Sequence, residues 1–292
     1  VLRAAREAAA KVAQQFDPSF TVAPLVAALV GDDGAPSERR PAVPPLSLNA
    51  WLRWDLVAPV IESVPVGRVL EIGPGRGAVA VRLAELGHEY VGVEMADDTR
   101  ALTSELLAAR GLHGRLCASF DELGPDERFD LVCSFEVIEH IDDDDAALKV
   151  WVDRLAPGGM FVLSTPADPA RYGPWDELAG HFRRYADDDV ADMVRRAGLI
   201  DVHVRRYGGI GGDVLEFARN LIARVSARGR STPSDGDDMR TRTERSSSLL
   251  QPGSRLGACT RLLSAPARIV QRRTPRRGPG IVLTARSRPD VG

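Results

Sequence analysis

The sequence predicts an α/β domain in which strands and helices alternate around a mostly parallel sheet. Short apolar runs, separated by helical stretches, follow one another from residue 68 to about residue 207. Such alternation is typical of parallel strands joined by crossover helices that cover both faces of the sheet. A glycine-rich turn at residues 73–77 follows the first run. This order of strand, turn and helix is typical of a cofactor site.

Composition limits the class of protein. The chain of 292 residues, 44% hydrophobic and 27% charged, can bury one core with appendages. Its net charge of −3 argues against bulk affinity for nucleic acid, which needs a basic face. No apolar run reaches membrane-spanning length, and no secretory signal is visible. Because Cys117, Cys133 and Cys259 lack paired or metal-like spacing, we expect reduced thiols in a cytoplasmic protein.

We expect four parts along the chain. The parts are an N-terminal helical extension at residues 1–47, a core at residues 48–207, a helical and partly disordered insertion at residues 208–278, and a final strand with a tail at residues 279–292. The first part contains an alanine-rich helix over residues 2–16 and a Gly/Pro-rich linker over residues 31–45.

Periodicity predicts the remaining elements. They are helices over residues 48–64, 79–86 and 187–197, a strand over residues 201–207, basic amphipathic helices over residues 214–227 and 258–273, and a last strand over residues 280–286. Residues 229–257, rich in Ser, Asp, Arg, Thr and Gly, are expected to be disordered. The basic helices would form a lid with solvated arginines; a peripheral contact with an anionic membrane surface is the alternative.

The turn at residues 73–77 limits the choice of cofactor. Gly73, Gly75 and Gly77 let the backbone approach a ligand, and the following helix offers free N–H groups. Their spacing is one residue shorter than the dinucleotide fingerprint, and Glu71 stands where dinucleotide folds keep an apolar residue. A carboxylate facing the ligand would repel a pyrophosphate but could accept a hydrogen bond from an ammonium. S-adenosylmethionine (SAM) is therefore favoured over nicotinamide and flavin cofactors.

The second apolar run ends in another acid. Glu94 follows Glu71 by about one βαβ step, which is the position of an acid that holds ribose hydroxyls. An ordinary surface glutamate is the alternative interpretation. Met95, beside it, could cover one face of the adenine ring or pack in the core.

Two further segments complete a family pattern. Residues 129–140 read F-D-L-V-C-S-F-E-V-I-E-H, and residues 155–159 read L-A-P-G-G before a strand. With E-I-G-P-G-R-G at residues 71–77 and the acid at Glu94, in this order, the chain resembles the class I SAM-dependent methyltransferases from about residue 48 to residue 207. The resemblance implies a doubly wound, seven-stranded, mostly parallel sheet with N-terminal helices. It also implies a final antiparallel strand pair, with an insertion before the last strand that shapes an acceptor pocket.

The same resemblance suggests the other cofactor residues. Adenine recognition would fall near Ser119, which could hydrogen-bond the adenine edge, and Phe120, which could pack against it; Asp121 is an alternative equivalent. Arg53 lies in L-R-W-D, which is similar to an element whose arginine contacts the SAM carboxylate. Phe135, just before Glu136, completes the expected cofactor set.

Residues 136–140, E-V-I-E-H, are similar to a motif of the ubiquinone-biosynthesis O-methyltransferases. That resemblance implies a divalent cation such as Mg²⁺ held by Glu136, Glu139 and His140, with His181 as the downstream histidine. Carboxylate and imidazole ligands suit such a cation, which would activate an acceptor hydroxyl. Alternatively, His140 or His181 is a plain catalytic base, or both are structural.

The expected function is transfer of a methyl group from SAM to a hydroxyl of a small-molecule acceptor. An NAD(P)-dependent oxidoreductase would share the strand, turn and helix, but Glu71 and the shortened glycine spacing oppose it. A non-catalytic protein of the SAM-binding fold is a further alternative. A nucleic-acid methyltransferase is disfavoured by the net charge.

Overall fold

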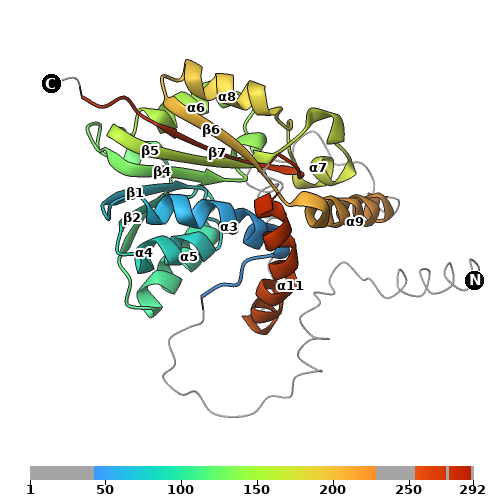
Figure 1. Ribbon diagram of the computed structural model, residues 1–292. Coiled ribbons are helices and arrows are strands. Elements are labelled where there is room, and N and C mark those ends of the chain that lie inside the picture. The colour runs from blue at the N-terminus through green and yellow to red at the C-terminus, as the bar shows by residue number, and fades with distance from the viewer. Residues whose placement is uncertain (1–42, 228–253, 274–275, 291–292) are drawn as a thin grey trace, which may run out of the picture. The chain divides into compact units, whose positions relative to one another are not determined.

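The computed structural model describes residues 43–227, 254–273 and 276–290. The strands in these ranges are β1 (Arg68–Ile72), β2 (Glu89–Val93), β3 (Gly114–Cys117), β4 (Phe129–Phe135), β5 (Leu155–Pro166), β6 (Ile200–Tyr207) and β7 (Gly280–Arg286). They form one sheet in the order β3-β2-β1-β4-β5-β7-β6 (Figure 1). Strands β1 to β5 pair in parallel, whereas β7 runs antiparallel to both β5 and β6. The predicted fold class and the antiparallel edge pair are confirmed.

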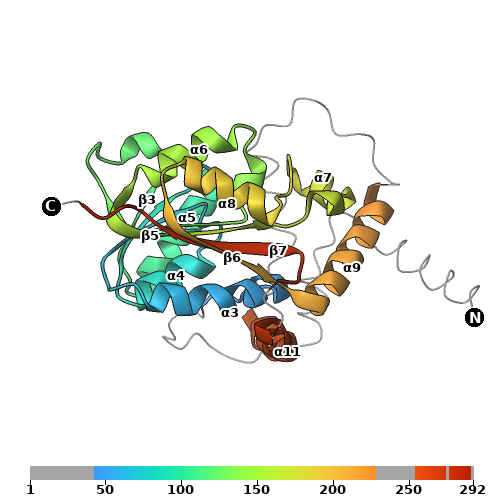
Figure 2. The ribbon, with the colours of Figure 1, turned by 45° about the horizontal axis from the view of Figure 1, so that its top comes forward.

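Helices cover both faces of this sheet (Figures 1 and 2). One face carries α3 (Leu48–Glu62), α4 (Ala78–Glu85) and α5 (Asp97–Ala109), and the other carries α6 (Asp144–Val152) and α8 (Asp187–Arg196). Short segments occupy the connections: η1 (Phe120–Glu122), η2 (Ile138–His140), η3 (Pro169–Arg171) and α7 (Pro174–Ala179). The helices predicted over residues 48–64, 79–86 and 187–197 are therefore present within one or two residues at each end.

The alternation of side chains along the strands divides the core in two. Leu70 packs with Trp151 and Val194 on the α6 and α8 face, whereas its neighbour Val69 packs with Leu83 on the α3 and α4 face. Both β1 residues are fully buried. Because central parallel strands are buried on both sides, their sequences read as continuous apolar runs. This is why the sequence reveals them so clearly.

The insertion between β6 and β7 contains α9 (Gly209–Ala227) and α11 (Ser254–Arg273). Helix α9 contacts α7, and α11 contacts α3. The prediction of disorder over residues 229–257 is wrong for residues 254–257, which begin α11; the stretch before them lies outside the described residues. Packing of α11 on α3 outweighs the low helix propensity of the glycine at 257. The elements predicted over residues 2–16 and 31–42 also lie outside the described residues.

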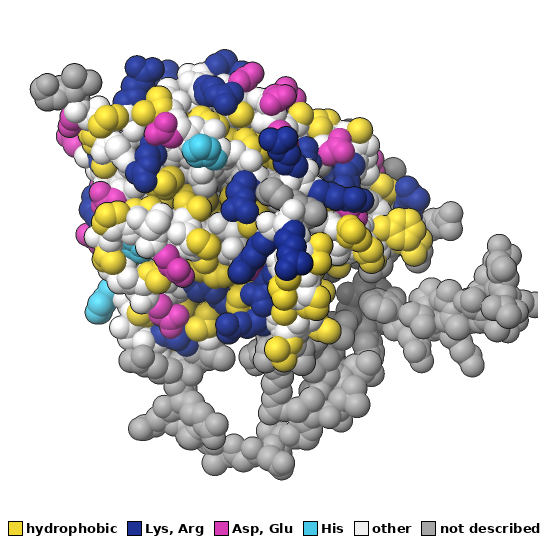
Figure 3. Space-filling view, viewed as in Figure 1, with side chains coloured by type: hydrophobic (Ala, Val, Ile, Leu, Met, Phe, Trp, Pro, Cys, Tyr) yellow, Lys and Arg dark blue, Asp and Glu magenta, His cyan; other side chains and the backbone are white. Residues whose placement is uncertain are grey.

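Several arginines of the insertion are exposed, as expected for a packed helical lid, and some of them also contact the domain. Arg272 of α11 pairs with Asp55 of α3 at 2.6 Å, and Arg261 lies over the Trp51 ring. Apolar side chains also point outward, among them Phe217 of α9 and Leu262 of α11. Figure 3 shows apolar side chains beside basic ones over these helices. No described helix is long and apolar enough to cross a membrane.

Candidate active site

The loops after β1 and β4 meet at the carboxyl edge of the sheet. The two strands are neighbours, yet the chain leaves β1 toward β2 and leaves β4 toward β5. Ligands of open α/β sheets bind where the strand order reverses in this way. A Cβ built on Gly73, after β1, would lie 2.5 Å from Cγ2 of Val137, after β4. The glycine turn and the E-V-I-E-H segment are therefore in direct contact.

The glycine turn has the conformation of a ligand cradle. Gly73, Gly75 and Gly77 have φ values of +68°, +55° and +77°, which non-glycine residues rarely adopt. Apart from its chain neighbours, no heavy atom of the described residues lies within 4 Å of a Cβ built on Gly75, so the space beside the turn is open. Gly77 caps α4 without a side-chain hydrogen bond to the first N–H groups of the helix. These N–H groups suit a polar ligand.

The Glu71 carboxyl lies beneath this turn, not at its surface. Only 2% of the residue is exposed, and the carboxyl accepts a hydrogen bond of 2.8 Å from the Tyr90 hydroxyl. Burial raises its pKa to about 8, against the effects of the Tyr90 hydrogen bond and the Arg53 charge. The Tyr90 hydroxyl thus supplies one hydrogen bond to this carboxyl, and the expectation that Glu71 faces a ligand stays a prediction.

Glu94 touches the turn directly. Its carboxylate accepts hydrogen bonds from the backbone N–H of Gly75 at 3.1 Å and of Ala96 at 3.0 Å. Burial raises its pKa, and these N–H groups limit the rise. Met95, beside it, is 51% exposed. A carboxylate fixed at the edge of the cradle is placed to reach ribose hydroxyls, so this role for Glu94 stays a prediction with a suitable geometry.

The residues expected near adenine lie after β3. Ser119 and Phe120 are both half-buried. The Ser119 hydroxyl accepts a hydrogen bond of 3.3 Å from the backbone N–H of Asp121, and Phe120 packs against the core. Both residues are therefore committed to local structure, and contact with an adenine ring remains a prediction.

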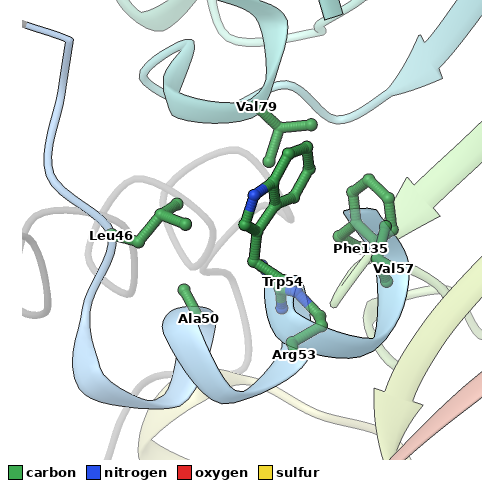
Figure 4. Close-up of a pocket in the computed structure, with 7 residues that line it drawn as sticks. All are labelled: Leu46, Ala50, Arg53, Trp54, Val57, Val79 and Phe135. Carbon is green, nitrogen blue, oxygen red and sulfur yellow. The ribbon is translucent and has the colours of Figure 1, made fainter. Parts of the chain in front are cut away.

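Arg53 and Phe135 line a narrow pocket between α3 and the start of α4 (Figure 4). The other lining residues are Leu46, Ala50, Trp54, Val57 and Val79. The Arg53 guanidinium lies 5.4 Å from the centroid of the Phe135 ring and 3.4 Å from Oε1 of Glu136. Arg53 thus already faces one carboxylate at the edge of the sheet, and a SAM carboxylate would compete with Glu136 for it.

Glu136 is held apart from the other predicted metal ligands. Its φ of +59° is rare for a residue other than glycine and turns the side chain toward β5 and β6. The carboxylate accepts hydrogen bonds from the hydroxyls of Ser164, at 2.9 Å, and Tyr207, at 3.0 Å. Among the predicted ligands, only the other three come together.

Glu139, His140 and His181 form that cluster, with one ligand atom from each within 4.8 Å of the others. Within the described residues, the Oε1 atom of Glu139 and the Nδ1 atom of His140 are buried without a hydrogen-bond partner. The two imidazole centroids are 4.7 Å apart. A carboxylate and two imidazoles with unsatisfied atoms are a donor set that fits a divalent cation.

Burial favours the uncharged forms of two members of this cluster. It raises the pKa of Glu139 well above its ordinary value, and the nearby charge of Glu136 adds to the rise. It lowers the pKa of His140 to about 4, with His181 contributing. At neutral pH the His140 imidazole is therefore uncharged. A free imidazole with this pKa is a weak base.

His181 is oriented by Asp176, a residue that sequence reasoning missed. Nδ1 of His181 lies 2.8 Å from Oδ1 of Asp176. Burial opposes ionisation of Asp176, but hydrogen bonds from His181 and Arg184 hold its pKa below the ordinary value. A carboxylate only accepts hydrogen bonds, so Nδ1 carries the proton and Nε2 has a free lone pair. No motif marks Asp176, since its role arises from the fold of α7 and the loop after it.

A second pocket, with an empty volume of about 440 Å³, opens beside His181 and Glu136. It is lined by Asn49, Glu136, Pro166, Trp175, Asp176, His181, Arg184, Tyr207, Gly212, Leu215, Glu216, Arg219 and Pro279. Four of these residues come from α9, in the insertion. The insertion thus forms one wall of a pocket that also contains a candidate catalytic histidine.

Comparison with known proteins gives matches over most of this region. A family model described as a methyltransferase domain matches residues 21–204. The chain is 38% identical over 101 residues to a ubiquinone biosynthesis O-methyltransferase of Bradyrhizobium sp. (strain ORS 278), covering 34% of this chain and 39% of that protein. It is 30% identical over 176 residues to the enzyme of the same name from Cereibacter sphaeroides (strain KD131), covering 50% and 64%. The chain spans less than two thirds of both relatives.

Solved structures share the fold at low sequence identity. A protein described as a methyltransferase from Bacillus halodurans C-125 aligns with a TM-score of 0.51 and 17% identity, over 80% of this chain and 98% of that one. A protein described as a sarcosine dimethylglycine methyltransferase from Galdieria sulphuraria aligns with a TM-score of 0.50 and 16% identity, over 83% and 86%. At such identity these likenesses bear on the fold alone.

Proposed function

Because the chain belongs to the methyltransferase domain family, we propose that it transfers a methyl group from SAM to a hydroxyl of a small molecule. The observation that carries the proposal is the contact between Gly73 and Val137, which joins the cofactor cradle to the segment that bears His140. Cofactor and acceptor would thus lie on either side of one crevice. The name O-methyltransferase, borne by both sequence relatives, supports oxygen as the nucleophile.

The cofactor residues divide between the two ends of SAM. Glu94 would hold the ribose hydroxyls, the glycine turn would take the polar methionine end, and Arg53 would meet the carboxylate. SAM supplies an activated methyl group. The acceptor oxygen must attack this carbon in line with the sulfur, so alignment of the two molecules provides much of the rate.

His181 is the residue that would take the hydroxyl proton. Its Nε2 has a free lone pair, and the Asp176 carboxylate would stabilise the imidazolium that forms. His140, with a pKa lowered to about 4, is the weaker base of the two. His140 would instead shape the site by its ring contact with His181.

A divalent cation held by Glu139, His140 and His181 is the second candidate arrangement. The buried atoms without partners in Glu139 and His140 favour it. Such a cation would lower the pKa of the acceptor hydroxyl. It can be tested by metal analysis of the purified protein and by thermal unfolding with and without chelator. Bound metal that is lost in Glu139→Gln would support the cation; absence of metal with unchanged activity in chelator would exclude it.

Calorimetric titrations with SAM and with NAD test the function itself. We expect SAM to bind and Glu94→Gln to weaken binding, while Glu105→Gln, an exposed control on α5, leaves binding unchanged. NAD binding without SAM binding would contradict the proposal. Incubation with labelled SAM and host extract would then identify the acceptor. If Glu94→Gln abolishes SAM binding but the variant keeps its cellular role, the protein is a non-catalytic member of the family.

Peripheral contact with a membrane is a further property that the insertion supports. Exposed Phe217 and Leu262 form part of the outward apolar surface of α9 and α11. Such surfaces bind at the boundary of headgroups and acyl chains. Co-sedimentation with phosphatidylglycerol vesicles, lost in Phe217→Ser, would support this; recovery of all the protein in the supernatant would exclude it.

A further inference from the structure

We propose that the methyl acceptor carries an oxyanion, a carboxylate or a phosphate, and that Arg219 of α9 binds it in the pocket beside His181. The inference rests on the proposed function and adds the chemical class of the substrate. It starts from the pattern of charges around the second pocket, where one arginine lacks the partner that the other charged groups have.

Arg219 points from the insertion into the pocket. Its guanidinium lies 5.4 Å from the centroid of the Trp175 ring. Within the described part of the chain, Arg219 forms no ion pair or hydrogen bond with a carboxylate. Burial lowers its pKa, against the charges of Glu136 and Glu216. A partly desolvated cation without its own counter-ion favours binding of an anion.

The carboxylates of the same pocket are already paired with other arginines. The pairs are Glu136 with Arg53, Asp176 with Arg184, and Glu216 with Arg171 and Arg184. Glu136 is the single carboxylate that pairs with Arg53 among the described residues, whereas Arg171 also pairs with Asp213, and Arg184 has two carboxylate partners. None of these carboxylates forms an ion pair with Arg219, so its guanidinium can bind an external anion without breaking a pair.

The arginine is also held in a defined orientation. The backbone N–H of Trp175 donates a hydrogen bond of 3.0 Å to Oδ1 of Asn220, the residue after Arg219. This bond fixes α7 against α9 and keeps the indole beside the guanidinium. A guanidinium stacked on an aromatic ring keeps its N–H edge available for bidentate binding of a carboxylate or phosphate.

The two ends of the pocket together define the acceptor. A hydroxyl near Nε2 of His181 would be the methylated group, and an oxyanion at Arg219 would fix the rest of the molecule. Hydroxy acids and hydroxylated phosphates satisfy both ends. Neutral phenols and unmodified sugars satisfy only one, so they are disfavoured as acceptors.

Calorimetry with three probes tests the inference on protein loaded with S-adenosylhomocysteine. We expect benzoate or phenyl phosphate to bind at least about tenfold more tightly than benzamide, since hydrogen bonds to charged groups contribute about 1.5–3 kcal/mol. Which of the two anions binds more tightly separates a carboxylate from a phosphate. Arg219→Gln should abolish the preference and Arg219→Lys should reduce it. Arg224→Gln, an exposed arginine on the same helix, should leave it unchanged.

The inference would be overturned if benzamide bound as tightly as the anions, or if neither anion bound. It would also be overturned if the preference for anions survived in Arg219→Gln. Repeating the titrations without S-adenosylhomocysteine separates it from the proposed function. If the protein fails to bind SAM yet keeps an Arg219-dependent preference for anions, the function is wrong but the anion site stands. Unfolding temperatures show whether the variants are folded. If Arg219→Gln does not fold, Arg219→Lys still tests the inference.

Discussion

Nδ1 of His181 donates a 2.8 Å hydrogen bond to Oδ1 of Asp176 at the edge of the second pocket. Asp176 itself is fully buried and also accepts hydrogen bonds from Nε and a terminal nitrogen of Arg184, at 2.8 and 2.7 Å. The carboxylate thus sets both the tautomer and the orientation of the imidazole. This relationship distinguishes His181 from His140, whose buried Nδ1 has no partner in the part of the chain that the structure describes.

Asp176→Asn should lower the rate of methyl transfer while leaving SAM affinity nearly unchanged. The amide cannot stabilise an imidazolium, and a positioned base contributes about 10²–10⁴-fold to the rate. We expect a loss in kcat of about 100-fold, measured with labelled SAM once the acceptor is known. Asp192→Asn, an exposed control on α8, should have no effect. An unchanged kcat in Asp176→Asn would exclude the role given to the His181 pair.

Stability should fall as the pH rises from about 4.5 toward 8, through the titration of Glu71. Burial raises the pKa of this carboxyl from 4.5 to about 8 in the folded protein. The folded state therefore binds the proton more tightly than the unfolded state, and this contribution to stability is present at low pH and lost as the pH rises. Urea unfolding of the ligand-free protein at several pH values measures the effect.

Glu71→Gln is the matched variant for this pH dependence. A glutamine does not titrate, so the free energy of unfolding should fall less steeply with pH than in the parent protein. It can still pair with the Tyr90 hydroxyl. Identical pH profiles for the two proteins would show that the Glu71 carboxyl is not the group responsible.

Gly73→Ala should destabilise the fold and weaken SAM binding. Its Cβ would lie 2.5 Å from Cγ2 of Val137, and the φ of +68° adds backbone strain of order 1 kcal/mol or more. Gly158→Ala is a useful comparison, because it has a φ of +73° but no atom within 4 Å of the added Cβ. Gly158→Ala should therefore show strain alone. Equal losses of stability in both variants would mean that contact with Val137 adds nothing.

Asp55→Ala should destabilise the protein by about 1–3 kcal/mol, because it leaves the buried side-chain amide of Gln271 with an unsatisfied donor, whereas the exposed Arg272 returns to water. The Asp55 side chain is 3% exposed and binds Arg272 at 2.6 Å and Gln271 at 3.1 Å. Removing it would leave the docking of α11 on α3 without its main polar contact. Denaturant unfolding measures the loss, with Asp126→Ala on an exposed loop as control. A change below about 1 kcal/mol would show that apolar packing alone holds α11.

The family and the fold could be predicted because their signals are local. The glycines of the turn after β1 require left-handed backbone, and a single apolar run records each buried strand. The last strand appears at residues 280–286 as predicted, since its apolar sequence needs no partner to be recognised. The boundaries of the four predicted parts and the roles of the cofactor residues remain predictions.

The candidate site was predicted less completely. The E-V-I-E-H segment suggested one ligand cluster, but the positive φ of Glu136 sends its carboxylate to Ser164 and Tyr207 instead. Likewise, the sequence did not indicate that the Tyr90 hydroxyl donates a hydrogen bond to Glu71. In both cases the partner comes from another strand, and spacing within one segment carries no information about it.

By itself, the sequence determined the strand–turn–helix unit around Gly73, the acid at Glu94 and membership of the methyltransferase family, because these depend on backbone conformation and on patterns within short segments. Only the tertiary structure decided that Asp176 orients His181 and that Arg219 of α9 enters the pocket beside it. Those contacts join residues brought together by the docking of α7 and α9. Their geometry depends on packing between elements far apart in the chain, which no local pattern records.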